Sequence, residues 1–256
     1  MKSEISVIIS TFDDRKYIEK KLLEVQRQTA FERAEFIFIE PASPGREREL
    51  LEPFCEEHPN CRLITSEECL SLYQAWNVGW EAATAPIICI SNMDDAMHPH
   101  LLAEVIDGMA QNAWDITSVL IAKQGVDEEM NSWNHQRLAR LELSTRPGPF
   151  FAWRTDLRGR VGMFDESLVL VGDKDFWSRM IDSGLKVGVI SKVLYLYTKH
   201  ATQLSKSGEF RSLKKMDRNS CENKVYPQLW PTAYTNQVRW ARVLRKLPFF
   251  KKYYVG

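Results

Sequence analysis

A short apolar run that ends in acidic residues constrains the fold of this chain more than any other feature. Ile87-Ile88-Cys89-Ile90 is uninterrupted and is followed directly by Ser91-Asn92-Met93-Asp94-Asp95. Such a run is typical of a buried strand in a parallel sheet, and open α/β sheets bind ligands at the carboxyl edge. The oxygen-rich turn favours Mg²⁺ or Mn²⁺ that holds substrate phosphates. An Asp pair that only caps the next helix is an equally good interpretation of this short motif.

Strand and helix patterns alternate along the chain. β-branched apolar runs predict strands at residues 5–9, 36–39, 62–65, 87–90 and 116–122. Helical spacing predicts helices between Asp13-Asp14 and Val25 and at residues 46–54, 72–83 and 99–111. A later helix is predicted at 173–183, ended by Gly184, with strands at 187–190 and 193–197 after it. This alternation indicates an α/β fold with a mainly parallel sheet flanked by helices.

Composition narrows the class of protein. The 256 residues fit one large domain with an extension, and we expect a domain at 1–205 and an extension at 206–256. The net charge is +0, so no global field favours nucleic acid, and no nucleic-acid partner is expected. The five cysteines form no CxxC pair, which favours reduced thiols in a cytoplasmic protein. We find neither a signal peptide nor an apolar stretch long enough to span a bilayer.

The 206–256 extension is basic, and aromatic residues are interleaved with its cations, most densely from Arg239 to Tyr254. One interpretation is a helix whose apolar face packs on the domain while its charges face water. The other is an interfacial segment that lies on an anionic membrane, which would make the protein peripheral on the cytoplasmic face.

Several motifs in order resemble the family 2 glycosyltransferases, inverting enzymes with a GT-A fold. The resemblance covers residues 4–205. Its parts are the opening strand and turn at 5–13, the second strand at 35–40, the helix segment 75–79, and Asn92-Met93-Asp94-Asp95 in the place of the DxD motif. The segments 161–166 and 173–179 resemble the region of the catalytic base, and Tyr197-Thr198-Lys199-His200 resembles the strand end near the metal.

The resemblance implies a role for each site residue. Asp94 and His200 would hold the metal, and Asp173 would be the general base that takes the acceptor proton. Trp153 and Asp175 would lie on the acceptor side. The residues implied in nucleotide-sugar binding are Thr11, Asp13, Glu40, Asn77, Asn92, Asp94 and Asp95. Taken singly, His200 fits a structural histidine as well, and Asp175 fits a first-turn acid favoured by the helix dipole.

Three positions depart from the family pattern. Asn92 replaces the usual first acid of DxD, which lowers the negative charge beside the ribose. Glu40-Pro41 replaces a common pair of acids after the second strand, and Gly172-Asp173 replaces the frequent Glu-Asp. The residues implied as metal ligand and base remain in place.

The implied activity is metal-dependent, inverting transfer of a hexosyl or N-acetylhexosaminyl group, with Mn²⁺ or Mg²⁺ as cofactor. The acceptor would be a glycan or lipid-linked glycan, as in cell-surface polysaccharide biosynthesis. One alternative is a catalytically inactive carbohydrate-binding or scaffold domain, which Asn92 keeps open. The other is a sugar nucleotidyltransferase, but Ser10-Thr11-Phe12-Asp13 lacks the glycines that hold a triphosphate.

Overall fold

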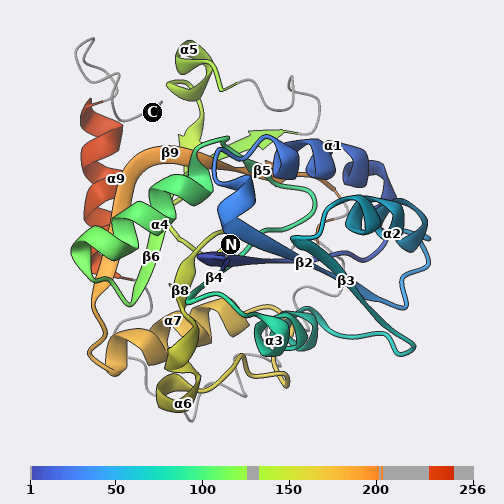
Figure 1. The fold of residues 1–256 in the computed structure, drawn as a ribbon. Helices are drawn as coiled ribbons and strands as arrows, with labels where there is room; N and C mark the ends of the chain where they lie inside the picture. The colour runs from blue at the N-terminus through green and yellow to red at the C-terminus, as the bar shows by residue number, and fades with distance from the viewer. Residues whose placement is uncertain (1, 126–132, 202, 204–230, 245–256) are drawn as a thin grey trace.

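In the part of the chain that the structure describes, a nine-stranded sheet with helices on both faces forms the body of the molecule (Figure 1). The computed structural model describes residues 2–125, 133–201, 203 and 231–244. Within them the strand order is β3-β2-β1-β4-β8-β6-β9-β5, and β7 pairs with β6 outside this path. The predicted α/β sheet flanked by helices is thereby confirmed.

The first half of the chain supplies the parallel part of the sheet. Its strands are β1 (Ile5–Ser10), β2 (Ala34–Pro41), β3 (Cys61–Ser66) and β4 (Ile87–Ile90). They are connected through α1 (Arg15–Gln26), η1 (Phe31–Arg33), α2 (Arg48–Glu57) and α3 (Leu72–Ala82). Neighbouring strands in this part are parallel, so their carboxyl ends meet at one edge of the sheet.

The second half mixes strand directions. It contains β5 (Ala96–Met97), α4 (Leu101–Asn112), β6 (Ile116–Gly125), α5 (His135–Leu138), β7 (Glu142–Leu143), β8 (Ala152–Arg154), η2 (Thr155–Leu157), α6 (Arg158–Val161), α7 (Gly172–Asp182), β9 (Val187–Lys199) and α9 (Thr232–Leu244). β8 pairs antiparallel with both β4 and β6. The two strands predicted at 187–190 and 193–197 form one strand, because register shifts opposite residues 119–121 absorb the residues between them.

Each face of the sheet buries its own apolar layer. Residues of α1, α2 and α4 pack on one face, and the aromatic residues of α3 and α7 pack on the other. The contact between α3 and β1 is close at Gly79, where an added Cβ would lie 2.5 Å from the Ile8 Cγ2 atom. A larger residue at this position would force α3 away from the strand that leads into the Thr11 loop.

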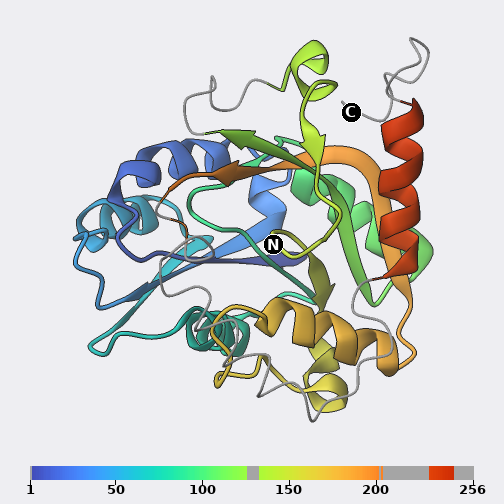
Figure 2. The same ribbon diagram turned by 180° about the vertical axis from the view of Figure 1, so that it is seen from behind.

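Helix α9 lies along β9 and β6 (Figure 2). Its Tyr234, Val238 and Ala241 are buried against sheet residues such as Leu120 and Leu196. The rest of the predicted 206–256 extension lies outside the described residues. Among the helices that the structure describes, none is long and apolar enough to cross a membrane.

Candidate functional site

The carboxyl ends of β4 and β9 bring Asp94 and His200 together. The Oδ2 atom of Asp94 lies 2.6 Å from Nε2 of His200. Both side chains are partly exposed, Asp94 to 19% and His200 to 12%. The two residues that the sequence implied as metal ligands are therefore in contact, although they lie 106 positions apart.

Asp14 lies close to this pair and was not predicted as a site residue. Burial, together with the nearby negative charges of Asp94 and Glu47, raises the pKa of Asp14 to about 6. A hydrogen bond from the Phe12 N–H and the neighbouring His200 side chain oppose this rise. From the sequence, Asp13-Asp14 reads as a helix cap, and only the folded position reveals a further carboxylate beside Asp94.

Glu47 is fully buried and joins two loops at this edge of the sheet, the loop after β1 and the loop after β2. Its Oε1 atom accepts the Asp14 N–H at 2.7 Å and the Thr11 hydroxyl at 3.4 Å. The Asp13 N–H donates to Ser43 Oγ at 2.8 Å, which adds a second connection between the loops. Of the residues implied in nucleotide binding, Thr11 is buried and Asp13 is exposed, and both belong to this joined pair of loops.

An open cavity of about 480 Å³ lies beside these loops, at the ends of β2 and β3. This volume falls within the range of small-molecule sites in proteins. Its polar lining residues are Glu40, Ser43, Arg46, Arg48, Glu49, Glu52, Thr65, Ser66 and Glu67. The structure therefore places Glu40, an implied nucleotide-binding residue, at a cavity of suitable size.

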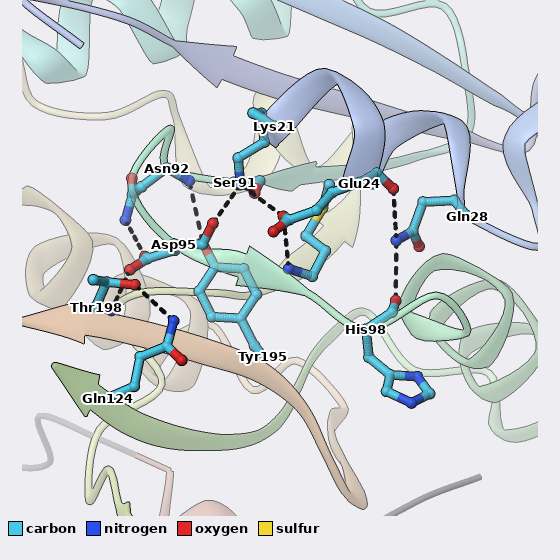
Figure 3. Close-up of polar contacts among 11 residues, drawn as sticks. Lys21, Glu24, Gln28, Ser91, Asn92, Asp95, His98, Gln124, Tyr195 and Thr198 are labelled. Atoms are coloured by element: carbon cyan, nitrogen blue, oxygen red, sulfur yellow. Dashed lines mark hydrogen bonds and ion pairs between the residues drawn. The ribbon is translucent and has the colours of Figure 1, made fainter. Parts of the chain in front are cut away.

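The Asp95 carboxylate lies within a buried polar network (Figure 3). It is 1% exposed, and its oxygens accept hydrogen bonds from Thr198 N–H at 2.8 Å and from the Asn92 amide and the Tyr195 hydroxyl at 3.0 Å each. Burial and the Asp94 charge raise its pKa well above the usual value, and the hydrogen bonds from Thr198 and Asn92 oppose the rise. The Asp95 carboxylate is therefore engaged inside the turn, and the half-buried Asn92 contributes its amide to the same network.

Three other predicted residues belong to the framework. Asn77 donates to the Phe164 carbonyl at 2.9 Å and to Glu166 at 2.8 Å, which fastens the 164–166 loop to α3. Trp153, expected on the acceptor side, is fully buried, because β8 is inserted in the sheet and its ring packs on the aromatic layer. Asp175 forms a buried ion pair with Arg179 at 2.8 Å, so it too lies away from solvent.

Asp173 stands in the first turn of α7. Gly172 before it packs so closely on Tyr73 that an added Cβ would lie 2.6 Å from the ring, and the Asp173 N–H donates to the Tyr73 hydroxyl at 3.4 Å. Burial raises the pKa of Asp173 to about 6, against the opposing effects of a Lys174 backbone hydrogen bond and the Arg146 charge. A carboxyl group of this pKa is ionised at neutral pH and still accepts a proton readily.

Comparisons with known proteins agree on the family and fold. The model of glycosyl transferase family 2 matches residues 6–165, more than half of the chain. An uncharacterised glycosyltransferase of Nostoc sp. is 25% identical over 104 residues, which are 41% of this chain and 32% of that protein. The chain thus matches about a third of the length of this relative.

Two solved structures resemble almost the whole chain. S. aureus TarS 1-349 in complex with UDP-GlcNAc is 18% identical and has a TM-score of 0.66, over 97% of this chain and 74% of that one. The mannosyltransferase PcManGT from Pyrobaculum calidifontis, in complex with GDP-Man and Mn²⁺, is 16% identical and has a TM-score of 0.64, over 97% and 71%. These likenesses confirm the predicted GT-A fold.

Proposed function

Because this chain belongs to glycosyltransferase family 2, we propose that it transfers a sugar from a nucleotide-sugar donor to an acceptor hydroxyl. The observation that carries the proposal is the contact between Asp94 and His200 beside the joined loops of β1 and β2. A donor diphosphate at the Asp94–His200 pair would leave the nucleoside near the Glu40 cavity.

We propose that Mn²⁺ or Mg²⁺ accompanies the donor. Asp14, Glu47 and Asp94 bring three carboxyl groups close together at this edge, and their negative charges would repel a diphosphate that bound beside them without a cation. Among the described residues, no group of three or more His, Cys, Asp or Glu side chains is arranged to hold a metal. Asp94 and His200 fit an ion that takes its remaining ligands from phosphate and water. When bound, the ion would stabilise the charge of the leaving diphosphate.

Asp173 is our proposed general base. Inversion at the sugar requires direct attack by the acceptor hydroxyl, and a carboxylate of pKa about 6 accepts its proton at neutral pH. The close packing of Gly172 on Tyr73 supports this proposal, because it holds the first turn of α7 against α3. A glycan or lipid-linked glycan supplies a hydroxyl of this kind.

A thermal-shift screen tests the proposal. UDP and GDP, each with MnCl2, are the probes, because relatives of the same fold bind UDP-GlcNAc and GDP-Man. We expect the melting temperature to rise more with one nucleotide and Mn²⁺ together than with either alone. A ligand at about 100 times its Kd stabilises the native state by about 2.7 kcal/mol.

The same screen, together with an assay of UDP-GlcNAc and GDP-Man hydrolysis, separates the alternatives. A nucleotidyltransferase would be stabilised more by UTP or GTP than by the diphosphates. A catalytically inactive scaffold would show neither turnover nor hydrolysis of UDP-GlcNAc or GDP-Man. Absence of any nucleotide-dependent shift with Mn²⁺ or Mg²⁺ would contradict the proposed donor site.

We also propose that the C-terminal extension attaches the protein to the cytoplasmic face of a membrane. On α9, Trp240 is 62% exposed and Val243 is 56% exposed, and Arg239 beside them is exposed. Exposed aromatic and basic residues on one helix face fit an anionic lipid surface.

Liposome co-sedimentation checks this proposal. We expect the protein to pellet with phosphatidylglycerol vesicles, to stay in the supernatant with phosphatidylcholine, and to be released by added NaCl. Trp240→Ala should weaken pelleting, whereas the control Leu23→Ala, at an exposed leucine of α1 (51%), should not. Equal recovery with neutral and anionic vesicles would reject membrane attachment.

A further inference from the structure

The turn that carries Asp94 is fixed from two sides, and the two acids of the turn have different positions. Asp95 is 1% exposed and lies inside the network of Figure 3, whereas Asp94 reaches His200. We propose that Asp95, supported by Tyr195, is a positioning residue that sets the separation between Asp94 and His200. This inference rests on the proposed donor site and deepens it.

On the β9 side, Asp95 connects the two chain segments that carry the proposed metal ligands. Its Oδ1 atom accepts the Thr198 N–H at 2.8 Å, two residues before His200. Asp95 is also the covalent neighbour of Asp94. A single hydrogen bond, from the Thr198 N–H to Asp95, therefore ties the backbone beside Asp94 to the strand end that leads to His200.

Tyr195 supports the start of the same turn. Its hydroxyl accepts the Asn92 N–H at 3.1 Å and donates to Asp95 Oδ2 at 3.0 Å. The Asn92 amide donates to the same oxygen at 3.0 Å. The backbone at Asn92, two residues before Asp94, is thus tied to β9 through the Tyr195 hydroxyl. An amide side chain suits position 92, because a carboxylate there would face Asp95 with a like charge.

On the opposite side, α1 holds the turn through a buried cation. Lys21 is 0% exposed, and its Nζ atom donates to the Asp95 carbonyl at 2.8 Å and to Ser91 Oγ at 3.3 Å. Glu24 lies 3.5 Å from Lys21 and accepts the Met97 N–H at 3.1 Å. Because the turn is anchored to both α1 and β9, its backbone has little freedom, and Asp94 is held at the site.

Two variants remove these contacts with little change in volume. Tyr195→Phe removes the hydroxyl and leaves the Asn92 N–H without its partner. Asp95→Asn keeps one acceptor oxygen but turns the other into an NH₂ group, which must face either the Thr198 N–H or the Asn92 amide, donor against donor. Tyr234→Phe is the matched control, because Tyr234 is equally buried but packs between α9 and the sheet.

Affinity for Mn²⁺ is the main readout, measured by calorimetry and by electron paramagnetic resonance with UDP and with GDP. We expect Tyr195→Phe and Asp95→Asn to weaken Mn²⁺ binding about 10- to 100-fold, the usual effect of losing a partner that orients a metal ligand. Tyr234→Phe should bind Mn²⁺ as the parent does, because its hydroxyl takes no part in the network around Asp95. A purely structural role for Tyr195 would lower the melting temperature and leave Mn²⁺ affinity unchanged.

Crystal structures of the two variants give a readout that needs no metal and no donor. We expect the 2.6 Å contact between Asp94 Oδ2 and His200 Nε2 to be lost or lengthened in both. Its retention in both, or parent Mn²⁺ affinity in both, would overturn the positioning role. If the parent protein binds no Mn²⁺ with either nucleotide, the proposed donor site fails, and the crystal structures still decide whether Asp95 sets this spacing.

Discussion

Replacing Asp94 with alanine is expected to abolish Mn²⁺-dependent binding of the nucleoside diphosphate. The substitution removes one of the two proposed protein ligands, together with the negative charge that faces the ion. Loss of a partner that only orients a ligand lowers metal affinity up to about 100-fold, so loss of the ligand itself should exceed about 100-fold. Calorimetric titration of UDP and GDP, each with and without MnCl2, measures this directly.

Stability should change little in Asp94→Ala. The side chain is 19% exposed, and its contact with His200 is at the rim of the site rather than in the core. Its removal also relieves the repulsion that contributes to the raised pKa of Asp14. Asp107→Ala, at a 55% exposed carboxylate paired with Arg33, is the control for loss of one acidic charge. Parent affinity in the Asp94 variant would remove Asp94 from the metal site.

The strand and the acid that carry the site were predictable because both signals are local. A β-branched run must be buried, and a run of Ile87–Ile90 that ends in polar residues places them at the sheet edge. The predicted contact between Asp94 and His200, by contrast, came from the resemblance, since no local pattern relates residues 106 positions apart.

The sequence could not predict that Asp94 reaches His200 whereas Asp95 is buried. The two neighbours have the same side chain and the same local sequence signal. Which of them faces the site depends on Tyr195 and Thr198, which lie about a hundred positions further along the chain and meet Asp95 through the pairing of β5 with β9. Burial of Asp95 is thus a tertiary effect, and sequence reasoning assigned both acids to the ligand.

Glu47 and Trp153 are two further residues whose burial the local sequence does not reveal. A glutamate just before a helix reads as a solvated acid, yet Glu47 is buried because the 42–46 loop, with Ala42 and Arg46 at positive φ, folds over it. Trp153 follows a segment rich in Pro and Gly and reads as a loop residue, yet β8 pairs with two strands that lie far from it in sequence. Short strands of two or three residues carry no periodic signal of their own.

Asp173→Asn is expected to lower turnover by about 10²-fold or more while donor binding stays near the parent value. Asparagine keeps the size and much of the hydrogen bonding of the side chain but cannot take the proton from the hydroxyl of the acceptor substrate. A base that acts on the acceptor hydroxyl contributes to the transition state and little to the donor complex, so kcat should fall and the calorimetric Kd of the donor nucleotide should not.

The pH profile gives this prediction a second readout. The pKa of Asp173 is raised to about 6 by burial, so the active, ionised form is lost as pH falls through that value. Turnover of the parent should be level above about pH 7, reach half its maximum near the pKa of Asp173 at about 6, and fall about tenfold per pH unit well below it, since one proton inactivates one base. Asp173→Asn should lack this acid limb and show a low, flat rate in the same range.

Asp175→Asn distinguishes a base from a framework acid two residues away. Asp175 is fully buried and paired with Arg179 at 2.8 Å, so its neutralisation leaves a partly buried cation unpaired and should lower the melting temperature. The acid limb near pH 6 should persist in that variant, because Asp173 is still present. If Asp173→Asn instead transfers sugar at close to the parent rate with the acid limb intact, Asp173 is not the base. Asp165, at the start of the loop that Asn77 fastens to α3, is then the next carboxylate to test.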